Sequence, residues 1–404
     1  MDGKRKRDEE SPAPQVSIVL NGVEQAFLMS LPERDRVDIM LSMHSIQSAH
    51  QVSVPLRFRI LASKLPESVK QEAFLRCPCE SLSPKYLAWL EVALSIPIGV
   101  CQGPLAASRR MRKRALSAAR AKMDKVVVGH GKAKDGVMRV LSQMLCGERD
   151  TVALGLSGPP GIGKTTFAQQ AMSVLGRPIV FVSLGGASDS TLLTGHSYTY
   201  EGAACGRVVD ALREAKCMDP VIYFDELDKV SETPRGAEIV NTLVHLIDPS
   251  QNAKFRDKYL GFDLDLSRAT FVFSYNNPAR VCPVLLDRIA CIDCAPPSVE
   301  EKLSIARKHL IPRCIRRQAL KNPPALSDET LRHIVERHTE GELGVRNLER
   351  CLNRLYGSFS VWELSPDALA ADYRFERAEL GTDAVDRVLQ EGPAAAPAYA
   401  AMFT

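Results

Sequence analysis

Residues 158–165 read GPPGIGKT, and their composition and spacing are those of a loop that holds phosphate groups. The segment meets each fixed position of the pattern G-x-x-x-x-G-K-[ST]. Glycines let backbone N–H groups turn toward an anion, Lys164 can place a charge at the β- and γ-phosphates, and the Thr165 hydroxyl can bind Mg²⁺. We therefore predict that ATP and Mg²⁺ are bound by Gly158, Pro159, Pro160, Gly161, Ile162, Gly163, Lys164, Thr165 and Thr166.

A pair of carboxylates follows the apolar segment 221–224. Asp225 and Glu226 would emerge at the carboxyl end of a buried strand, which is the edge of a parallel sheet where ligands bind. We predict that Asp225 holds Mg²⁺ together with Thr165. Glu226 is then the candidate general base, because polarising an attacking water needs a carboxylate within hydrogen-bonding reach.

Two further polar residues follow apolar or helical segments later in the chain. Asn276 could orient a water over the γ-phosphate, although asparagines also form ordinary turns. Arg288 could neutralise charge on a transferred phosphoryl group, and such an arginine can come from a neighbouring subunit. Surface arginines are common, so the residues alone leave both roles open.

The elements that would position these residues alternate between strands and helices. Strand patterns occur at 152–156, 178–184, 221–224, 269–274 and 289–294. Helical stretches of about a dozen residues separate them, which is typical of an α/β fold with a parallel sheet. The pattern changes after Pro296 and Pro297, and we predict amphipathic helices at 298–312, 327–340 and 344–356. An Arg-rich helix is expected over 106–123.

The composition of the 404 residues is that of a globular protein, with 45% apolar and 25% charged residues. No run of 18 apolar residues occurs, so we expect no membrane span. The N-terminus lacks the apolar region of a secretory signal. We therefore expect a soluble intracellular protein, cytoplasmic unless the basic run Lys4–Arg7 directs it to the nucleus.

The cysteines and the basic clusters each allow a second interpretation. Eleven cysteines without framework spacing indicate reduced thiols. The pairs Cys77/Cys79 and Cys291/Cys294 lack a second pair at zinc-finger spacing, and we expect Cys291 in a buried strand. A basic cluster, favoured as a solvated helix face but also able to contact nucleic acid, consists of Arg109, Arg110, Arg112, Lys113, Arg114, Arg120 and Lys122.

Several longer strings make the sequence resemble the ATPase portion of Lon proteases, a branch of the AAA+ superfamily. The strings are GHSYTYEG at 195–202, DELDK at 225–229, LIDPSQN at 246–252, FRDKYL at 255–260 and GVRNLER at 344–350, with YLAWL at 86–90 upstream. The resemblance extends from about residue 66 to about residue 379. Together these strings are far more specific than a phosphate-binding loop alone.

The resemblance implies roles for individual residues. Asn276 falls on the family's sensor-1 asparagine, Arg288 on its arginine finger, and Arg346 on the sensor-2 arginine that touches the γ-phosphate. Tyr200 falls on the pore-loop aromatic that grips substrate polypeptide. A homo-hexameric ring is implied as well, since the arginine finger acts on a neighbouring subunit.

Two departures from the family pattern are visible. The residue after Tyr200 is the charged Glu201 in place of an apolar one, which weakens an apolar grip on polypeptide. About twenty-five residues follow the resemblance, so we expect no peptidase domain with its Ser-Lys dyad in this sequence. A separate peptidase is then a candidate partner.

The predicted organisation has five parts. These are a disordered tail at 1–15, a helical N-terminal region at 16–124, an AAA+ α/β nucleotide-binding domain at 125–296, an α-helical lid domain at 297–360, and a linker remnant with a disordered tail at 361–404. The predicted function is an ATPase that remodels or translocates polypeptides. The alternatives are an ATPase associated with nucleic acid and an ATP-binding regulatory protein with little turnover.

Overall fold

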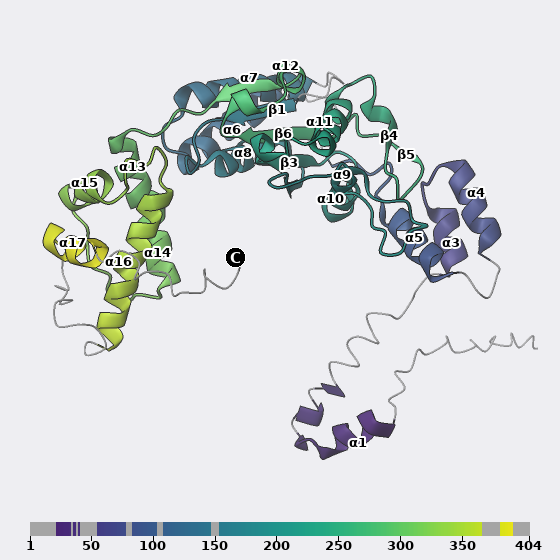
Figure 1. Ribbon diagram of the computed structural model, residues 1–404, viewed down its shortest axis with the longest axis horizontal. Coiled ribbons are helices and arrows are strands. Elements are labelled where there is room, and N and C mark those ends of the chain that lie inside the picture. The colour runs from purple at the N-terminus through teal and green to yellow at the C-terminus, as the bar shows by residue number, and fades with distance from the viewer. Residues whose placement is uncertain are drawn as a thin grey trace, which may run out of the picture. The chain divides into compact units, whose positions relative to one another are not determined.

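The computed structural model describes residues 22–33, 35–37, 39–40, 55–77, 83–102, 108–146, 153–365 and 380–390 (Figure 1). The tail predicted at 1–15, with Lys4–Arg7, lies outside the described residues, as does most of the segment predicted as linker and tail. The chain divides into two compact units, residues 1–83 and 84–404. Among the described residues, no helix is long and apolar enough to cross a membrane.

The first unit is helical in its described part. Its helices are α1 (Gly22–Ser30), α3 (Leu56–Ala62) and α4 (Glu67–Arg76). Helices α3 and α4 pack against each other, and Ile60 and Ala73 are fully buried.

The second unit is built on a parallel sheet of five strands. The strands are β1 (Ala153–Ser157), β2 (Ile179–Ser183), β3 (Val221–Asp225), β6 (Thr270–Tyr275) and β7 (Ala290–Asp293). Their order across the sheet is β2-β3-β6-β1-β7, and each neighbouring pair is parallel. The predicted strands are found at these places, shifted by one or two residues at their ends. The α/β fold with a parallel sheet is therefore confirmed.

Helices connect the strands because parallel neighbours need a crossover. The helices from the start of this unit to the end of the sheet are α5 (Pro84–Ser95), α6 (Arg109–Val126), α7 (Gly131–Cys146), α8 (Lys164–Met172), α9 (Thr191–Thr194), α10 (Arg207–Ala215), α11 (Pro234–Ile247) and α12 (Pro283–Asp287). Single 3₁₀ turns lie at Ser173–Leu175, Leu227–Lys229, Asn252–Lys254 and Pro278–Arg280, and β4 (Phe255–Arg256) pairs with β5 (Asp263–Leu264) in a short antiparallel ribbon.

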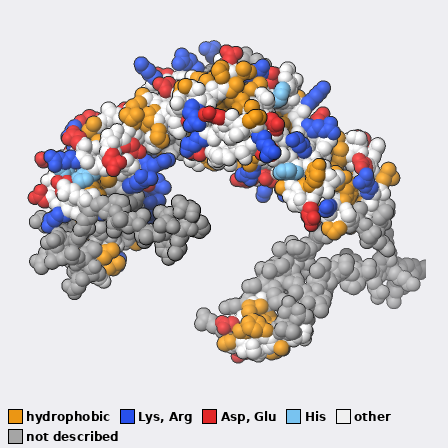
Figure 2. All heavy atoms as spheres, viewed as in Figure 1, with side chains coloured by type: hydrophobic (Ala, Val, Ile, Leu, Met, Phe, Trp, Pro, Cys, Tyr) orange, Lys and Arg blue, Asp and Glu red, His pale blue; other side chains and the backbone are white. Residues whose placement is uncertain are grey.

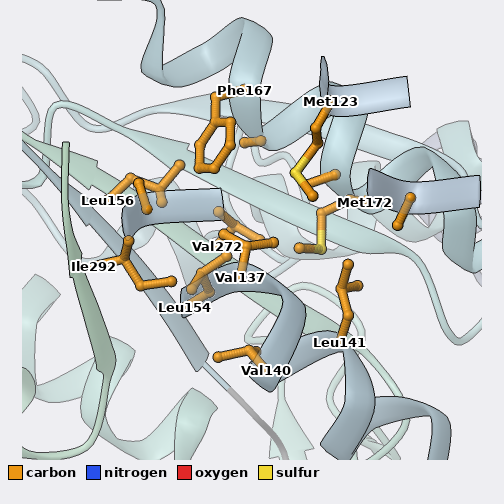
Figure 3. Packing of buried hydrophobic residues seen from close by; sticks show 14 of the residues in the cluster. Met123, Val137, Val140, Leu141, Leu154, Leu156, Phe167, Met172, Val272 and Ile292 are labelled. Atoms are coloured by element: carbon orange, nitrogen blue, oxygen red, sulfur yellow. The ribbon is translucent and has the colours of Figure 1, made fainter. Parts of the chain in front are cut away.

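One face of the sheet is covered by α6, α7 and α8 (Figure 3). Figure 3 shows Met123 of α6, Leu141 of α7 and Met172 of α8 pointing toward the strands, where Leu154 and Val272 are fully buried. The Arg-rich helix was predicted as part of a separate N-terminal region ending at residue 124. Its buried residues instead belong to the core of the α/β domain, so this domain includes residues before 125.

The opposite face of the sheet carries aromatic side chains. Phe224 stacks on Phe273 with ring centroids 5.2 Å apart and on Phe271 at 6.4 Å. Helix α10 packs against β2 on the same domain. Alternate residues of the central strands β1, β3 and β6 thus face two apolar layers, which explains why these strands read as continuous apolar runs.

The third part of the structure is a helical lid that follows the sheet. Its helices are α13 (Val299–Ile305), α14 (Ile311–Arg317), α15 (Asp328–Arg337), α16 (Arg346–Leu364) and α17 (Thr382–Gln390). Ser298 and Glu301 form a capping box that starts α13. Between α13 and α14 the chain makes one π-helical turn, η5 (Ala306–Leu310), in which the Ile311 N–H donates to Ala306 O.

The lid extends beyond its predicted end at residue 360. Helix α16 continues to Leu364, and α17 lies in the region predicted as linker remnant and tail. Leu380, Val385 and Val388 are buried in the same apolar cluster as α15 and α16. Residues 380–390 therefore belong to the lid, because their apolar face completes its core.

Candidate functional site

The glycine-rich loop joins β1 to α8 with three glycines in conformations that other residues rarely adopt. The φ angles are 141° at Gly158, 78° at Gly161 and 90° at Gly163. A Cβ on Gly158 would lie 2.4 Å from the backbone oxygen of Cys294. Gly163 is the N-cap of α8, so the helix N-terminus with its unpaired N–H groups opens directly from the loop.

Lys164 projects from the first residue of α8 into the loop. Its Nζ donates to Gly158 O at 2.6 Å, to Pro159 O at 2.9 Å and to Asn276 Oδ1 at 2.8 Å. Burial lowers the pKa of this ammonium from its ordinary value, and the nearby carboxylate of Asp225 partly opposes the shift. The loop therefore presents a half-buried cation whose present partners are neutral oxygens.

Asp225 and Thr165 lie at the carboxyl ends of β3 and the loop. Asp225 Oδ1 accepts hydrogen bonds from Ser274 Oγ and from the Glu226 N–H, the latter at 3.0 Å. Tyr223 OH donates to Thr165 Oγ1 at 3.3 Å. Among the described residues, no hydrogen bond is made to Asp225 Oδ2. Hydrogen bonds to Oδ1 thus hold the Asp225 carboxylate in place, and Oδ2 remains free to bind Mg²⁺, which prefers oxygen ligands.

Glu226 adopts a left-handed backbone conformation with φ 60°. Such a conformation is costly for a residue other than glycine and often marks a functional site. The carboxylate is half-exposed and pairs with Lys229, one turn further along the chain. It also lies against the end of β2, where a Cβ on Gly185 would come within 2.0 Å of Glu226 Oε2. The absence of a side chain at Gly185 leaves room for the candidate base.

The lid contacts the glycine-rich loop directly. The Val345 N–H donates to Gly161 O at 3.1 Å, and a Cβ on Gly344 would lie 2.5 Å from Pro160 O. The next residue, Arg346, is the first of α16 and lines the same cavity as the loop. Its guanidinium makes no ion pair within the described part of the chain, so it can approach a ligand.

These residues line one cavity of about 480 Å³, within the roughly 300–1,000 Å³ typical of small-molecule sites. The predicted residues around it are Pro160, Gly161, Ile162, Gly163, Lys164, Thr165, Thr166, Asp225, Glu226, Asn276 and Arg346. Gly158 and Pro159 contact Lys164 through their carbonyl oxygens, as described above. The structure therefore brings together residues from β1, β3, β6 and the lid that are far apart in the sequence.

The other end of the cavity contains two histidines that the sequence did not single out. His130 follows α6 and stacks on Phe167 with ring centroids 6.3 Å apart, while His309 lies in the π-helical turn η5. His130 Nδ1 and His309 Nε2 are buried without a hydrogen-bond partner. Burial lowers the pKa of both imidazoles. Burial thus favours the neutral form of both rings, which line the cavity beside the apolar residues Val127 and Ile305.

Arg288 does not line the cavity. It is the C-cap of α12, and its guanidinium pairs with the Asp248 carboxylate. The pKa of Asp248 is lowered to about 2, first by hydrogen bonds from Ser250 and then by Arg288. The arginine is thus held at the surface by this ion pair, outside the cavity.

Tyr200 lies in the segment between α9 and α10. Its side chain is 68% exposed, whereas Tyr198 in the same segment packs against Trp89 of α5, with ring centroids 5.9 Å apart. The Lys85 side chain also donates to Thr199 O, at 3.4 Å. Helix α5 thus contacts this segment at Tyr198 and Thr199 and leaves Tyr200, the predicted pore-loop aromatic, exposed.

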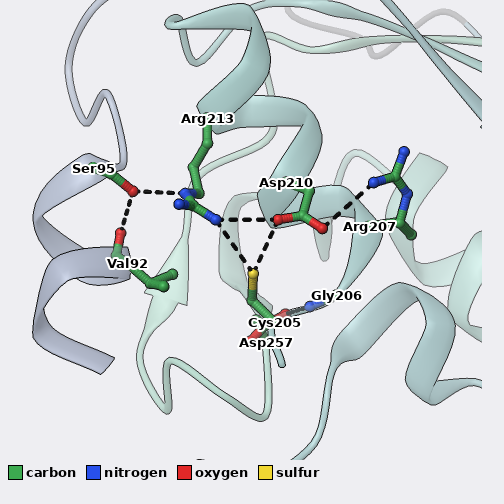
Figure 4. Close-up of polar contacts among 8 residues, drawn as sticks. All are labelled: Val92, Ser95, Cys205, Gly206, Arg207, Asp210, Arg213 and Asp257. Atoms are coloured by element: carbon green, nitrogen blue, oxygen red, sulfur yellow. Dashed lines mark hydrogen bonds and ion pairs between the residues drawn. The ribbon is translucent and has the colours of Figure 1, made fainter. Parts of the chain in front are cut away.

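The base of this segment is fixed by polar contacts (Figure 4). The Gly206 N–H donates to Asp257 Oδ2 at 2.8 Å, and Arg213 of α10 bonds both Ser95 Oγ, at 2.7 Å, and Asp210 Oδ1, at 3.3 Å. Asp257 is fully buried, and its remaining oxygen accepts backbone N–H groups. The exposed tip is therefore attached to a rigid frame.

The basic cluster on α6 is partly neutralised. Arg120 donates to Asp124 at 3.1 Å and to Asp135 at 2.5 Å. On the face seen in Figure 2, Lys and Arg side chains of the described residues are interspersed with acidic and apolar ones. The ion pairs of Arg120 favour a solvated helix face for α6.

The strand position expected for Cys291 is observed, but its burial is not. Cys291 is exposed because β7 is the edge strand of the sheet, whereas Cys294 at the strand end is buried. Burial raises the pKa of the Cys294 thiol to about 12. Cys79 of the other pair lies outside the described residues.

Comparisons with known proteins agree with this geometry. Residues 154–294 match the family described as "ATPase family associated with various cellular activities (AAA)". The chain is 35% identical over 327 residues to a Lon protease of Salinispora arenicola, covering 76% of this chain and 41% of that protein. It is 39% identical over 238 residues to a Lon protease homolog of Acanthamoeba polyphaga mimivirus, covering 58% of this chain and 23% of that protein.

A third relative is a Lon protease of Campylobacter concisus, 41% identical over 198 residues, which are 49% of this chain and 24% of that protein. The chain therefore spans less than half the length of these relatives. The family match at 154–294 covers the parallel sheet and the glycine-rich loop.

Proposed function

We propose, on the premise that this chain carries an AAA+ ATPase region of the Lon family, that it hydrolyses ATP to drive remodelling or translocation of polypeptides. The observation that carries the proposal is the convergence of Lys164, Asp225, Glu226 and Asn276 on one cavity of suitable size. These residue types supply a phosphate-binding cation, a metal-binding oxygen, a base and an amide. Phosphoryl transfer to water needs these four functions.

The phosphate end of the cavity would hold the triphosphate. The loop N–H groups and Lys164 bind the β- and γ-phosphates, and Arg346 approaches the γ-phosphate from the lid. Thr165 and Asp225 fit Mg²⁺, because both offer oxygen ligands and Asp225 has a free acceptor. When bound there, the ion would neutralise charge on the phosphate oxygens. Glu226 accepts the proton of the attacking water, and Asn276 orients that water.

The apolar end of the cavity would hold the base. His130 and His309 line this end, and burial lowers the pKa of both imidazoles, which favours their neutral forms. A purine has ring nitrogens and an exocyclic amino group that can pair with neutral imidazoles. Apolar lining residues such as Val127 and Ile305 would contact the faces of the purine ring.

The proposal includes a homo-hexameric ring. Arg288 lies outside the cavity of its own subunit, so it can assist hydrolysis only at a neighbour's site. Tyr200 then faces the substrate path, with Glu201 beside it giving that path an acidic element. A separate peptidase remains a candidate partner, and the reaction proposed for the residues described here is ATP hydrolysis without peptide cleavage.

An ATPase assay of the purified chain tests the proposal. We expect Mg²⁺-dependent hydrolysis that unfolded polypeptide stimulates, with no degradation of that polypeptide. Glu226→Gln should keep ATP binding and lose turnover, because the amide cannot accept the proton. Glu232→Gln is a matched control, since this exposed carboxylate pairs with Arg280 outside the cavity. Hydrolysis that persists in Glu226→Gln would refute the assigned base.

Nucleic acid is the second candidate partner, because the basic cluster at 109–122 is largely exposed. The same assay includes duplex DNA, and retention on DNA is measured against salt. Binding whose affinity falls steeply with salt, together with stimulation by DNA and none by polypeptide, would favour this alternative. ATP binding and assembly without turnover would instead indicate a regulatory protein.

A further inference from the structure

A cluster of two histidines and one carboxylate lies in the lid, apart from the nucleotide cavity. His333 Nε2 and His338 Nε2 each lie 2.7 Å from the same atom, Asp386 Oδ1. The two imidazole rings meet edge to face, with centroids 5.7 Å apart. None of the three residues lines the cavity proposed for ATP.

Two separate segments of the lid bring these side chains together. His333 lies within α15, and His338 is the residue that ends this helix, with φ −111° and ψ −1°. Five residues along a regular helix would place the two side chains well apart in azimuth. The chain leaves the helix at His338, so its ring can turn back toward His333. Asp386 comes from α17, 48 residues later in the chain.

The geometry points to a transition-metal site, and we propose that His333, His338 and Asp386 bind Zn²⁺. Two imidazole nitrogens and one carboxylate oxygen are ligands that Zn²⁺ prefers. The three ligand atoms lie within 4.8 Å of one another. The side chains are 10–23% exposed, which leaves room for water as a further ligand.

Metal binding requires a small expansion of the cluster. Ligands about 2.1 Å from a tetrahedral ion lie roughly 3.4 Å from each other, so each N···O separation must grow from 2.7 Å by about 0.7 Å. His338 is at a helix end and Asp386 is only partly buried, so both side chains have room to adjust by this amount. The proton on each Nε2 leaves to solvent when the nitrogen binds the ion.

The site would join α17 to the rest of the lid. Helix α17 already buries Val385 and Val388 against α15 and α16. Zn²⁺ would add a coordinate cross-link between two segments that are distant in the chain. Since the ion binds the folded lid and not the separated segments, its binding free energy adds to the stability of the lid.

Zn²⁺ titration of the full chain by calorimetry tests the proposal, with thermal unfolding as a second readout. We expect one saturable Zn²⁺ site per chain, formed by His333, His338 and Asp386, and a higher unfolding temperature with Zn²⁺. Co²⁺ should bind the same site and give a visible absorption band. His333→Ala and Asp386→Asn should each weaken Zn²⁺ binding by roughly a hundredfold or more, because even outer partners of metal ligands contribute about 10–100-fold.

The variant Asp386→Asn distinguishes a metal site from a cluster whose only role is to join α15 and α17 by hydrogen bonds. Its amide oxygen can still accept both Nε2–H groups, so the metal-free unfolding temperature should stay near that of the wild type while the Zn²⁺-induced rise is lost. Asp383→Asn, in the same helix but outside the cluster, should keep wild-type Zn²⁺ binding. Unchanged Zn²⁺ affinity in Asp386→Asn and His333→Ala would overturn the proposal, as would the absence of Zn²⁺ binding to the wild type.

Discussion

Lys164 Nζ lies 2.8 Å from Asn276 Oδ1, so a residue at the start of α8 and a residue at the end of β6 are hydrogen-bonded across the phosphate end of the cavity. Two loop carbonyls complete the contacts of the ammonium. An incoming phosphate must therefore compete with neutral oxygens for this cation. A neutral amide at residue 276 keeps that competition weak.

Asn276→Asp should weaken ATP binding by about tenfold or more. The new carboxylate would form a charge-assisted hydrogen bond with Lys164, worth roughly 1.5–3 kcal/mol, and would repel the triphosphate. Affinity for a fluorescent ATP analogue measures the change. Asn277→Asp is the matched control, since residue 277 caps the following turn outside the cavity and aspartate can accept the same N–H. Equal affinity in both variants would contradict the assigned contact.

Arg288→Ala should lower ATP hydrolysis by about a thousandfold or more while ATP binding stays within a few-fold of the wild type, since an arginine supplied to a transferred phosphoryl group acts at the transition state. The variant lacks the arginine but retains its own phosphate site. The variant Lys164→Met retains Arg288 but lacks the lysine of its own phosphate site.

Mixing Arg288→Ala with Lys164→Met tests whether the arginine acts between subunits. Within a mixed ring, Lys164→Met subunits can supply Arg288 to the intact phosphate sites of their neighbours, so steady-state hydrolysis should exceed the sum of the two separate proteins. The variant Asp248→Asn releases Arg288 from its present ion pair, so it tests whether that pair restrains the arginine. Simple additivity in the mixture would show that Arg288 does not act across the interface.

Tyr200→Ala should leave the folded protein almost unchanged and abolish polypeptide-stimulated ATPase activity. The side chain is mostly exposed, and surface substitutions usually change stability by no more than about 0.5 kcal/mol. Unfolding temperature, basal ATPase activity and stimulated ATPase activity are measured together. Tyr200→Phe keeps the ring and should keep stimulation. Stimulation that survives in the alanine variant argues against a role of this loop in gripping substrate.

His130→Asn should reduce the loss of stability between neutral and mildly acidic pH. Burial lowers the His130 pKa, so the unfolded chain takes up a proton near pH 6.5 before the folded protein does. Stability contributed by the neutral ring is therefore complete above about pH 6.5 and falls as the pH drops toward the folded pKa. Asparagine tolerates the left-handed backbone of residue 130, where φ is 54°.

Unfolding free energies from urea titrations at pH 7 and below measure this effect. Lys132→Gln changes a nearby exposed residue without removing an imidazole, so it should keep the pH dependence of the wild type. A pH dependence of His130→Asn equal to that of the wild type would show that His130 does not contribute to it.

Local patterns predicted the parts of the fold that depend on local interactions. The glycine-rich loop was recognisable because its φ angles demand glycine at Gly158, Gly161 and Gly163. The central strands β1, β3 and β6 were recognisable because both of their faces are buried. The sequence gives no such signal for His130 and His309, which meet only through the packing of the lid and the helix before the sheet. A single histidine on an apolar stretch is ordinary in a protein core.

The lid's C-terminal part was missed for a different reason. Helix α17 is nine residues long and precedes an alanine- and proline-rich end, so its composition suggested a tail. Its stability comes from the burial of Val385 and Val388 in a core formed by earlier residues. The burial of Cys291 was wrongly predicted because strand order, which places β7 at an edge, is not visible in the strand itself.

The π-helical turn at 306–310 decides which side chains of α14 face the cavity. One residue more than an α-helical turn needs is accommodated there, so α14 is rotated by about 100° relative to an uninterrupted helix of the same length. Straightening this turn without losing a residue would carry Arg313 around the axis, away from the cavity that it lines, whereas deleting one residue would restore a regular helix and leave Arg313 in place. Substitutions that decide between the two forms of the turn could thus exchange one set of lining side chains for another, with the lid still folded.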